Sequence, residues 1–99
     1  MKQTSQSLNG TSFHDSTITA SLTQLKTICG EPTCYGDTDD KVQYEWDMET
    51  ADGTPFTIYD WKEYRKFGAN EMIEWHIGGF SRYETSKAQD EVQETLAQL

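Results

Sequence analysis

Long hydrophobic runs, cysteines and histidines are all scarce in this 99-residue chain. No apolar run approaches the roughly 18 residues of a membrane span, and the polar segment 1–10 has no apolar stretch of the kind that a secretory signal contains. Cys29 and Cys34 are too few for a disulfide framework, and His14 and His76 lie too far along the chain for the paired spacing of a zinc site. We therefore expect a cytoplasmic protein with reduced thiols, no membrane partner, no metal and no cofactor.

Basic residues are also few: eight Lys and Arg stand against seventeen Asp and Glu, which gives a net charge of −9. Binding to duplex nucleic acid depends on an excess of cations that displaces condensed counterions. We therefore expect no direct contact with a nucleic-acid duplex. Eight of the acids fall between residues 31 and 59, where Lys41 is the only base. That region is expected to attract a basic protein surface.

Motifs of known catalytic and ligand-binding loops are missing as well. The chain has neither a GxxxxGK phosphate-binding loop nor a dinucleotide fingerprint. An EF-hand beginning at Asp37 would need Gly and Glu at its sixth and twelfth positions, where this chain has Val42 and Met48. In the run from His14 to Ser16, neighbouring strand residues point to opposite faces, so the three cannot form a catalytic relay. These absences favour a protein that is not an enzyme.

What the chain has in quantity is aromatic side chains, which make up 12% of it against a total hydrophobic content of 34%. A buried aromatic side chain removes about 150–250 Å² from water, so the Trp, Tyr and Phe residues can supply much of one small core. A chain of this length has room for a single domain. We expect that domain over residues 9–99, after a flexible polar tail at residues 1–8.

The clearest pattern is an unbroken alternation of apolar and polar residues from Lys41 to Glu49. Its apolar members are Val42, Tyr44, Trp46 and Met48, and its polar members include Glu45, Asp47 and Glu49. A period of two predicts a strand with one buried face and one face in water. The carboxylates are therefore expected to face solvent.

Shorter patterns predict the remaining elements. A capping-box pattern at Ser21 starts a short helix that ends at Gly30, and a second such pattern at about Ser86 starts a helix that runs to the C-terminus. Strands are expected at residues 13–20, 41–49, 56–61 and 72–77. The resulting β-α-β-β-β-α order predicts an α+β fold, an antiparallel β-sheet with two helices packed on one face.

Two surfaces remain as candidate binding sites, and the first is an acidic stripe on the outside of the predicted hairpin. Its members are Asp39, Asp40, Glu45, Asp47, Glu49 and Asp52. Alternate carboxylates on one strand would stand about 7 Å apart, given a rise near 3.3 Å per residue. The stripe would bind a basic protein surface. The alternative is an ordinary solvated sheet face whose charges keep the sheet edge from aggregating.

The second candidate surface interleaves aromatic rings with cations. Its members are Tyr59, Trp61, Arg65, Trp75, His76 and Arg82. Aromatic platforms beside cations suit a small nucleotide ligand, and the backbone at Gly78-Gly79 can form an anion-binding nest. The alternative is that Trp75 and one of Tyr59 and Trp61 belong to the core, while the cations offset neighbouring acids.

Six short segments between residues 9 and 79 together carry a family resemblance. They are Gly10–His14, Gly30–Pro32, Glu45–Trp46, Asp52–Thr54, Thr57–Lys62 and Trp75–Gly79. In these segments the chain resembles a group of small, mostly uncharacterised bacteriophage-encoded proteins. The resemblance implies an accessory phage protein of the host bacterial cytoplasm, and small acidic proteins of that origin are often inhibitors of host defence. It carries over no catalytic residue, and origin alone does not establish function.

Together these observations predict a non-enzymatic binding protein, a phage-type inhibitor of a host defence component that acts through the acidic stripe or by sequestering a small nucleotide. An immunity-type protein that neutralises a basic toxin would use the same acidic surface. A small hydrolase using His76 with Glu74 or Asp60 is a further alternative, because Glu74 and His76 would share a strand face. A homodimer through that face, which also holds Met72, stays open.

Overall fold

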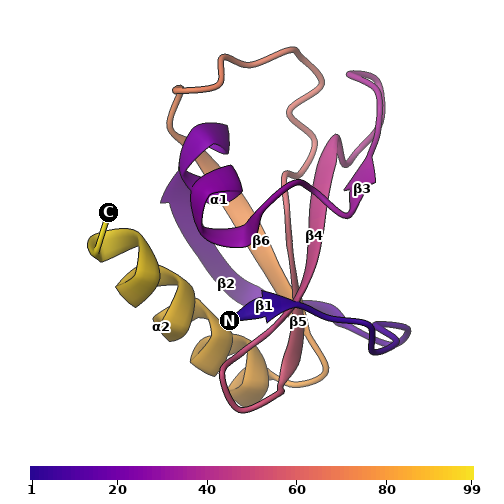
Figure 1. Cartoon of the computed structure of the whole chain (residues 1–99). Coiled ribbons are helices and arrows are strands. Elements are labelled where there is room, and N and C mark those ends of the chain that lie inside the picture. Colours follow the sequence, from indigo (N-terminus) through magenta and orange to yellow (C-terminus); the bar gives the residue numbers. More distant parts are fainter.

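The computed structural model describes all residues from 1 to 99. Its elements in chain order are β1 (Lys2–Gln3), β2 (Ser12–Ala20), α1 (Leu22–Cys29), β3 (Cys34–Tyr35), β4 (Tyr44–Glu49), β5 (Pro55–Tyr59), β6 (Ile73–Gly79) and α2 (Arg82–Ala97). The predicted α+β class, with an antiparallel sheet and two helices, is confirmed (Figure 1). The two-residue strands β1 and β3 were not predicted.

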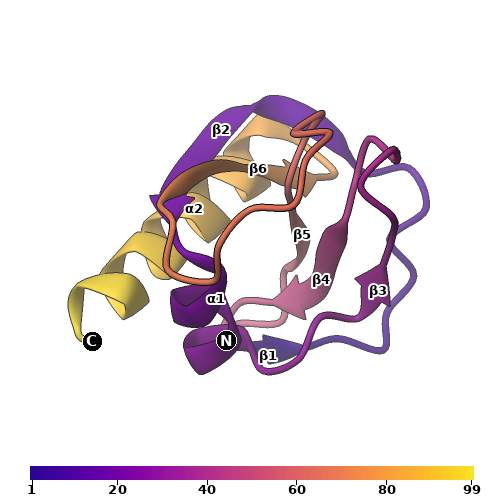
Figure 2. The same cartoon turned by 90° about the horizontal axis from the view of Figure 1, so that it is seen from above.

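All strands belong to one antiparallel sheet in the order β1-β4-β5-β6-β2. The short strands β1 and β3 share one edge of β4: β1 pairs with Met48 and Glu49, and β3 pairs with Tyr44 and Glu45. Seen from above, the sheet curves strongly from β2 round to β3 (Figure 2). One face of this curved sheet carries the core, and the other forms the site described below.

The core lies between the inner face of the sheet and the two helices. Trp46 of β4 pairs in register with Ile58 of β5, and both side chains are fully buried. The ring of Trp75 meets that of Trp46 edge to face, with the ring centroids 5.5 Å apart. The indole N–H of Trp46 donates to the carbonyl of Gly30, and that of Trp75 donates to the carbonyl of Ala20, both at 2.9 Å. The polar atoms of both large core side chains are therefore satisfied.

Strand β4 is shorter than the alternation of residues 41–49 predicted. Trp46 points into the core as expected, and Tyr44 packs against the core from a partly buried position. The alternation fails before the strand begins, where Gln43 is buried and Val42 is only half-buried. The cause is Asp60, whose Oδ1 accepts hydrogen bonds at 2.8 Å from the backbone N–H groups of both Gln43 and Tyr44. Two successive N–H groups that turn toward one acceptor cannot both follow a strand ladder.

Both helices begin after a capping serine. Ser21 accepts a hydrogen bond from the N–H of Gln24 at 3.1 Å and donates its own N–H to the Gln24 side chain at 3.0 Å, so the predicted capping box is present. The predicted start of α2 at Ser86 is wrong. The helix begins directly after Ser81, whose hydroxyl accepts from the N–H of Glu84 at 3.1 Å. Neither helix has the length and hydrophobicity needed to cross a membrane.

The first residues of the chain lie against the sheet, whereas the sequence predicted a flexible tail over residues 1–8. Lys2–Gln3 pair with the edge of β4 as strand β1. The side-chain amide of Gln3 also donates to the carbonyls of Cys29 and Glu31, at 3.0 and 2.6 Å. The polar composition led to the prediction of a tail, but main-chain pairing with an open strand edge requires no apolar side chain.

Candidate functional site

The outer face of the sheet, opposite the core, carries the candidate site. Its members from three adjacent strands are Glu45, Asp47 and Glu49 of β4, Thr57 and Tyr59 of β5, and His76 and Gly78 of β6. The strand register places Glu45 beside Tyr59 and Asp47 beside Thr57, and it places Thr57 beside Gly78. The prediction that the three β4 carboxylates share one face is therefore confirmed.

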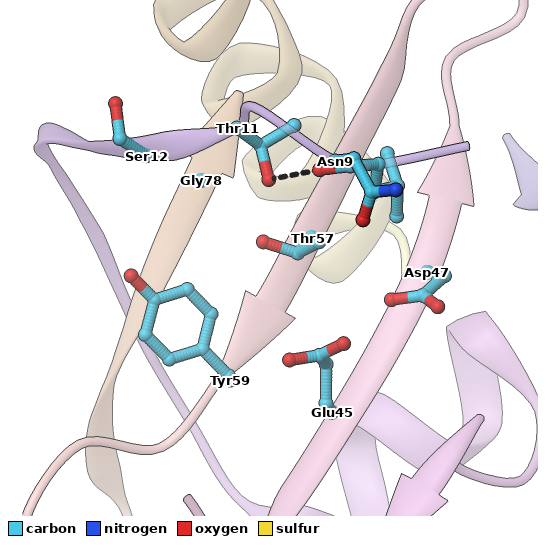
Figure 3. A pocket seen from close by; sticks show the side chains of 9 residues that line it. Asn9, Thr11, Ser12, Glu45, Asp47, Thr57, Tyr59 and Gly78 are labelled. Carbon is cyan, nitrogen blue, oxygen red and sulfur yellow. Dashed lines mark hydrogen bonds between the residues drawn. The ribbon is translucent and has the colours of Figure 1, made fainter. Parts of the chain in front are cut away.

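The outer face is hollowed into a pocket of about 430 Å³. Its lining comes from the loop before β2 and from the outer face: Leu8, Asn9, Thr11, Ser12, Glu45, Asp47, Thr57, Tyr59 and Gly78 (Figure 3). A volume of this size falls within the range of small-ligand sites, roughly 300–1,000 Å³. Most of the lining atoms belong to hydroxyl, amide and carboxyl groups, so the pocket suits a polar or charged group.

A glycine on β6 leaves room in the pocket beside Thr57 and Tyr59. A Cβ atom at Gly78 would lie 2.7 Å from the hydroxyl oxygen of Thr57 and 3.5 Å from Cε1 of Tyr59. The first separation is too short, so a side chain at position 78 would displace the Thr57 hydroxyl, whereas the second is an ordinary contact with the Tyr59 ring. That ring lies beside Gly78 and turns a face toward the pocket (Figure 3).

A tight turn closes the pocket at the other end. The backbone N–H and the hydroxyl of Thr11 both donate to the carbonyl of Leu8, at 3.1 and 2.8 Å (Figure 3). Gly10 within the turn has φ +94°, a value that residues other than glycine rarely adopt. The turn therefore places Asn9 and Thr11 opposite the β4 carboxylates.

Glu45 and Asp47 form the charged side of the pocket, and both are half-buried. The pKa of Glu45 is raised from 4.5 to about 7; burial is the largest cause, followed by the hydrogen bond with Asp47 and the charge of Asp47. At neutral pH the carboxyl of Glu45 is therefore close to half-protonated.

No cation of the protein neutralises this pair. None of the ion pairs in the structure includes Glu45 or Asp47. Oδ1 of Asp47 is also buried without a hydrogen-bond partner. A buried carboxylate oxygen that accepts no hydrogen bond is unfavourable. A positively charged donor in the pocket would therefore be favoured beside this pair of carboxyls.

Cys34 of β3 lies beside this pair, since it faces Glu45 across the strand pairing. The thiol and one oxygen from each of Glu45 and Asp47 lie within 4.8 Å of one another. Burial and the charges of the two carboxylates raise the pKa of the thiol. Zinc binding needs the thiolate and, in structural sites, four ligands. With three donors and a thiol that resists ionisation, the arrangement is a poor zinc site. Both cysteines are free thiols.

Four rings form an aromatic cluster next to the pocket: Phe13, Tyr59, Trp61 and His76. The His76 ring is stacked between Phe13 and Trp61, with centroid distances of 4.0 and 5.9 Å and interplanar angles of 14° and 23°. Tyr59 meets His76 edge-on at 5.5 Å. Burial lowers the pKa of His76 more than the neighbouring charge of Glu74 raises it. Phe13 and Trp61 stay 38% and 39% exposed, so the cluster is accessible from solvent.

The predicted nucleotide site is only partly assembled. Tyr59, Trp61 and His76 come together in the aromatic cluster, but Trp75 is fully buried in the core on the other face. Arg65 forms an ion pair with Glu71 in the loop before β6. Arg82, at the start of α2, donates to the carbonyl of His14 at 3.1 Å and to Asp15 at 3.3 Å. The six residues therefore do not form one groove, because alternation along β6 separates Trp75 from His76.

The predicted acidic stripe divides into three parts. Glu45 and Asp47 line the pocket, and Glu49 follows them on the same face. Asp39 and Asp40 lie exposed in the loop between β3 and β4. Asp52 lies at the tip of the β4–β5 hairpin. Its hydrogen bond from Lys87 of α2, together with those from Thr50 and Thr54, holds the pKa of that carboxyl well below its usual range.

The residues considered for a hydrolase are not joined in a dyad. Asp60 is fully buried, and its Oδ1 serves the backbone of Gln43 and Tyr44. His76 lies on the outer face between aromatic rings. Its only acidic neighbour there is Glu74, and no hydrogen bond connects the two.

Sequence reasoning missed most of the pocket. Thr57 carried a usable signal, because it alternates with buried residues on its strand, and Gly78 was considered only as part of an anion-binding nest. The wall formed by residues 8–12 carried no such periodic signal, and Leu8 was assigned to the predicted polar tail. Comparison of this chain with protein-family models, with curated proteins and with solved structures found no match.

Proposed function

We propose that this chain is a non-enzymatic binding protein that docks on a basic protein surface and receives one basic side chain of that partner in the pocket of the outer face. The observation that carries the proposal is the unneutralised pair of Glu45 and Asp47 in a pocket open to solvent. A partner cation would supply the hydrogen-bond donor that Asp47 lacks. It would also remove the repulsion between the two carboxylates.

The overall charge of the chain also favours a basic partner. The net charge of −9 raises the local concentration of basic partners and speeds their association. Glu49 lies beside the pair on β4, and the exposed loop with Asp39 and Asp40 lies at the other end of the strand. Those exposed acids would steer the partner, whereas the half-buried pair would hold it.

The geometry weighs against a nucleotide as the ligand. Phosphate binding calls for cations or clustered N–H donors, whereas the pocket wall consists of carboxylates and hydroxyls. Arg65 and Arg82 are both occupied by acidic partners elsewhere. The raised pKa of Cys34 leaves a weak nucleophile, which favours binding over catalysis.

In a phage-encoded setting the protein would act as an inhibitor of a host defence component, by covering a basic surface that the component needs. An immunity-type protein would apply the same recognition to a basic toxin. The two roles differ in the partner and share the pocket.

The test compares two double variants that each replace two carboxyl groups by amides. Binding of a peptide of alternating lysine and arginine is measured by calorimetry at low and at physiological ionic strength. Glu45→Gln with Asp47→Asn should weaken binding by roughly tenfold or more, because it removes desolvated charge-assisted hydrogen bonds. Asp39→Asn with Asp40→Asn should weaken binding by only about twofold, because exposed charges are screened.

Equal effects from the two double variants would mean that net charge alone attracts the peptide, and the pocket would lose its role. Circular dichroism and thermal unfolding of each variant confirm that the comparison is made between folded proteins.

A further inference from the structure

The proposed function does not say which basic side chain the pocket prefers, and we infer that it is arginine, through its guanidinium group. This inference rests on the proposed function and adds to it the chemistry of the bound group. Three features of the pocket carry it: the arrangement of its acceptors, the position of the Tyr59 ring, and the exposed rings beside it.

The acceptors come from four positions on two neighbouring strands. Glu45 and Asp47 stand two residues apart on β4, and the register places Tyr59 and Thr57 beside them on β5. The side chains of Glu45 and Asp47 approach each other, so that an oxygen of one lies within 4.8 Å of an oxygen of the other. A lysine ammonium is a compact charge with three donors, whereas a guanidinium carries five donors in a flat fork. The flat fork can reach both carboxylates and a hydroxyl at the same time.

The Tyr59 ring provides a surface on which a flat cation can lie. The ring lies against β6 at Gly78, and one ring face borders the pocket (Figure 3). A guanidinium stacks on an aromatic face and gives up its hydration more readily than an ammonium does. Because Glu45 and Asp47 are half-buried, the cation must lose part of its hydration to reach them. Both properties favour arginine over lysine.

The exposed rings next to the pocket provide a surface that residues flanking an arginine in a folded partner could contact. Tyr59 belongs to both the pocket and the aromatic cluster, and from it the cluster continues to Trp61 and Phe13 across His76. Interfaces concentrate their binding energy in Trp, Tyr and Arg. An acidic pocket continuous with an exposed aromatic surface is therefore a complementary docking site for an arginine presented on a protein surface.

The experiment uses two short capped peptides that differ at one position, glycine-flanked arginine and glycine-flanked lysine, titrated into the isotope-labelled protein and followed by two-dimensional NMR. We expect the arginine peptide to bind roughly tenfold more tightly, the difference that one additional charge-assisted hydrogen bond with stacking provides. The amide signals of Thr57 and Gly78 should move. Tyr59→Phe should keep the preference for arginine, and Tyr59→Leu should reduce it to about twofold or less because the ring face is lost.

The outcomes separate this inference from the proposed function. If both peptides bind equally and Glu45→Gln weakens both, the arginine preference is refuted while the proposed function stands. If the peptide of alternating lysine and arginine also fails to bind, both are refuted. A last experiment adds zinc chloride to the complex with the arginine peptide. If zinc displaces the peptide from the native chain but not from Cys34→Ser, then Cys34, Glu45 and Asp47 bind a metal ion and the inference is overturned.

Discussion

The inner and outer faces of the sheet are built from alternating residues of the same strands. They differ in whether the polar groups of their main side chains have partners within the chain. On the inner face, the indole N–H groups of Trp46 and Trp75 each reach a backbone carbonyl at 2.9 Å. On the outer face, Glu45 and Asp47 are half-buried with no cation beside them, and an oxygen of Asp47 has no partner. The two indoles are satisfied within the chain, whereas the carboxyl pair is not.

This difference separates stability from binding. A satisfied, close-packed face stabilises the fold whether or not a partner is present. A half-buried carboxyl pair costs stability in the free protein, and a bound cation recovers that loss. We therefore expect inner-face substitutions to lower the free energy of unfolding, and substitutions of the carboxyl pair to change affinity while leaving stability equal or higher.

The largest expected effect on the free energy of unfolding comes from replacing a tryptophan of the inner face, with a tryptophan of the outer face as the comparison. Trp75→Ala should lower the free energy of unfolding by about 3–5 kcal/mol, because it opens a cavity in the core. Trp61→Ala should lower it by about 1 kcal/mol, because this ring is already 39% exposed. Urea denaturation followed by circular dichroism measures both. Equal losses would contradict the assignment of the two rings to different faces.

An intermediate effect is expected from glycine substitution on the outer face. In Gly78→Ala the new Cβ would lie 2.7 Å from the Thr57 hydroxyl, so the strand or the side chain must shift. The expected loss is about 1–3 kcal/mol, the usual penalty of overpacking, and binding of the basic peptide should fall with it. The matched control is Gly68→Ala, where the nearest atom would be Cβ of Glu71 at 3.9 Å. Thermal unfolding should leave this control within about 0.5 kcal/mol of the native chain.

The smallest effect concerns the protonation of Glu45. Its pKa is about 7 in the folded chain and near 4.5 when unfolded, so the folded state binds more protons between these values. Stability therefore falls as pH rises from about 4.5 to 7, and it stays reduced above pH 7. Glu45→Gln removes this loss and should be more stable than the native chain by about 1 kcal/mol at pH 8, after allowance for solvent screening, with little difference at pH 4.5.

The control for this effect is Glu49→Gln, which removes the same charge from the same strand face. Urea denaturation at the two pH values gives the stability difference for each variant. If Glu45→Gln and Glu49→Gln change stability equally at pH 4.5 and pH 8, the raised pKa of Glu45 in the folded chain is refuted.

The alternation in β4 was enough to predict which residues face the core. Trp46 and Met48 are fully buried and the carboxylates between them lie on the opposite face, because neighbouring side chains of a strand always point to opposite sides. The same rule could have added Thr57 to the site. It could not predict that Asp60 would bind the backbone of Gln43 and shorten the strand, since that contact joins residues far apart in the sequence.

The sequence by itself therefore determined the α+β class, the capped start of α1 and the side-chain directions within β4 and β6, because these depend on spacing within one element. The tertiary structure decided that β1 would pair with the edge of β4, that the turn at Leu8 to Thr11 would close over the outer face, and that Glu45 and Asp47 would be enclosed rather than fully exposed. Those outcomes depend on backbone hydrogen bonds and sheet curvature between distant segments, which leave no periodic signal in the order of side chains.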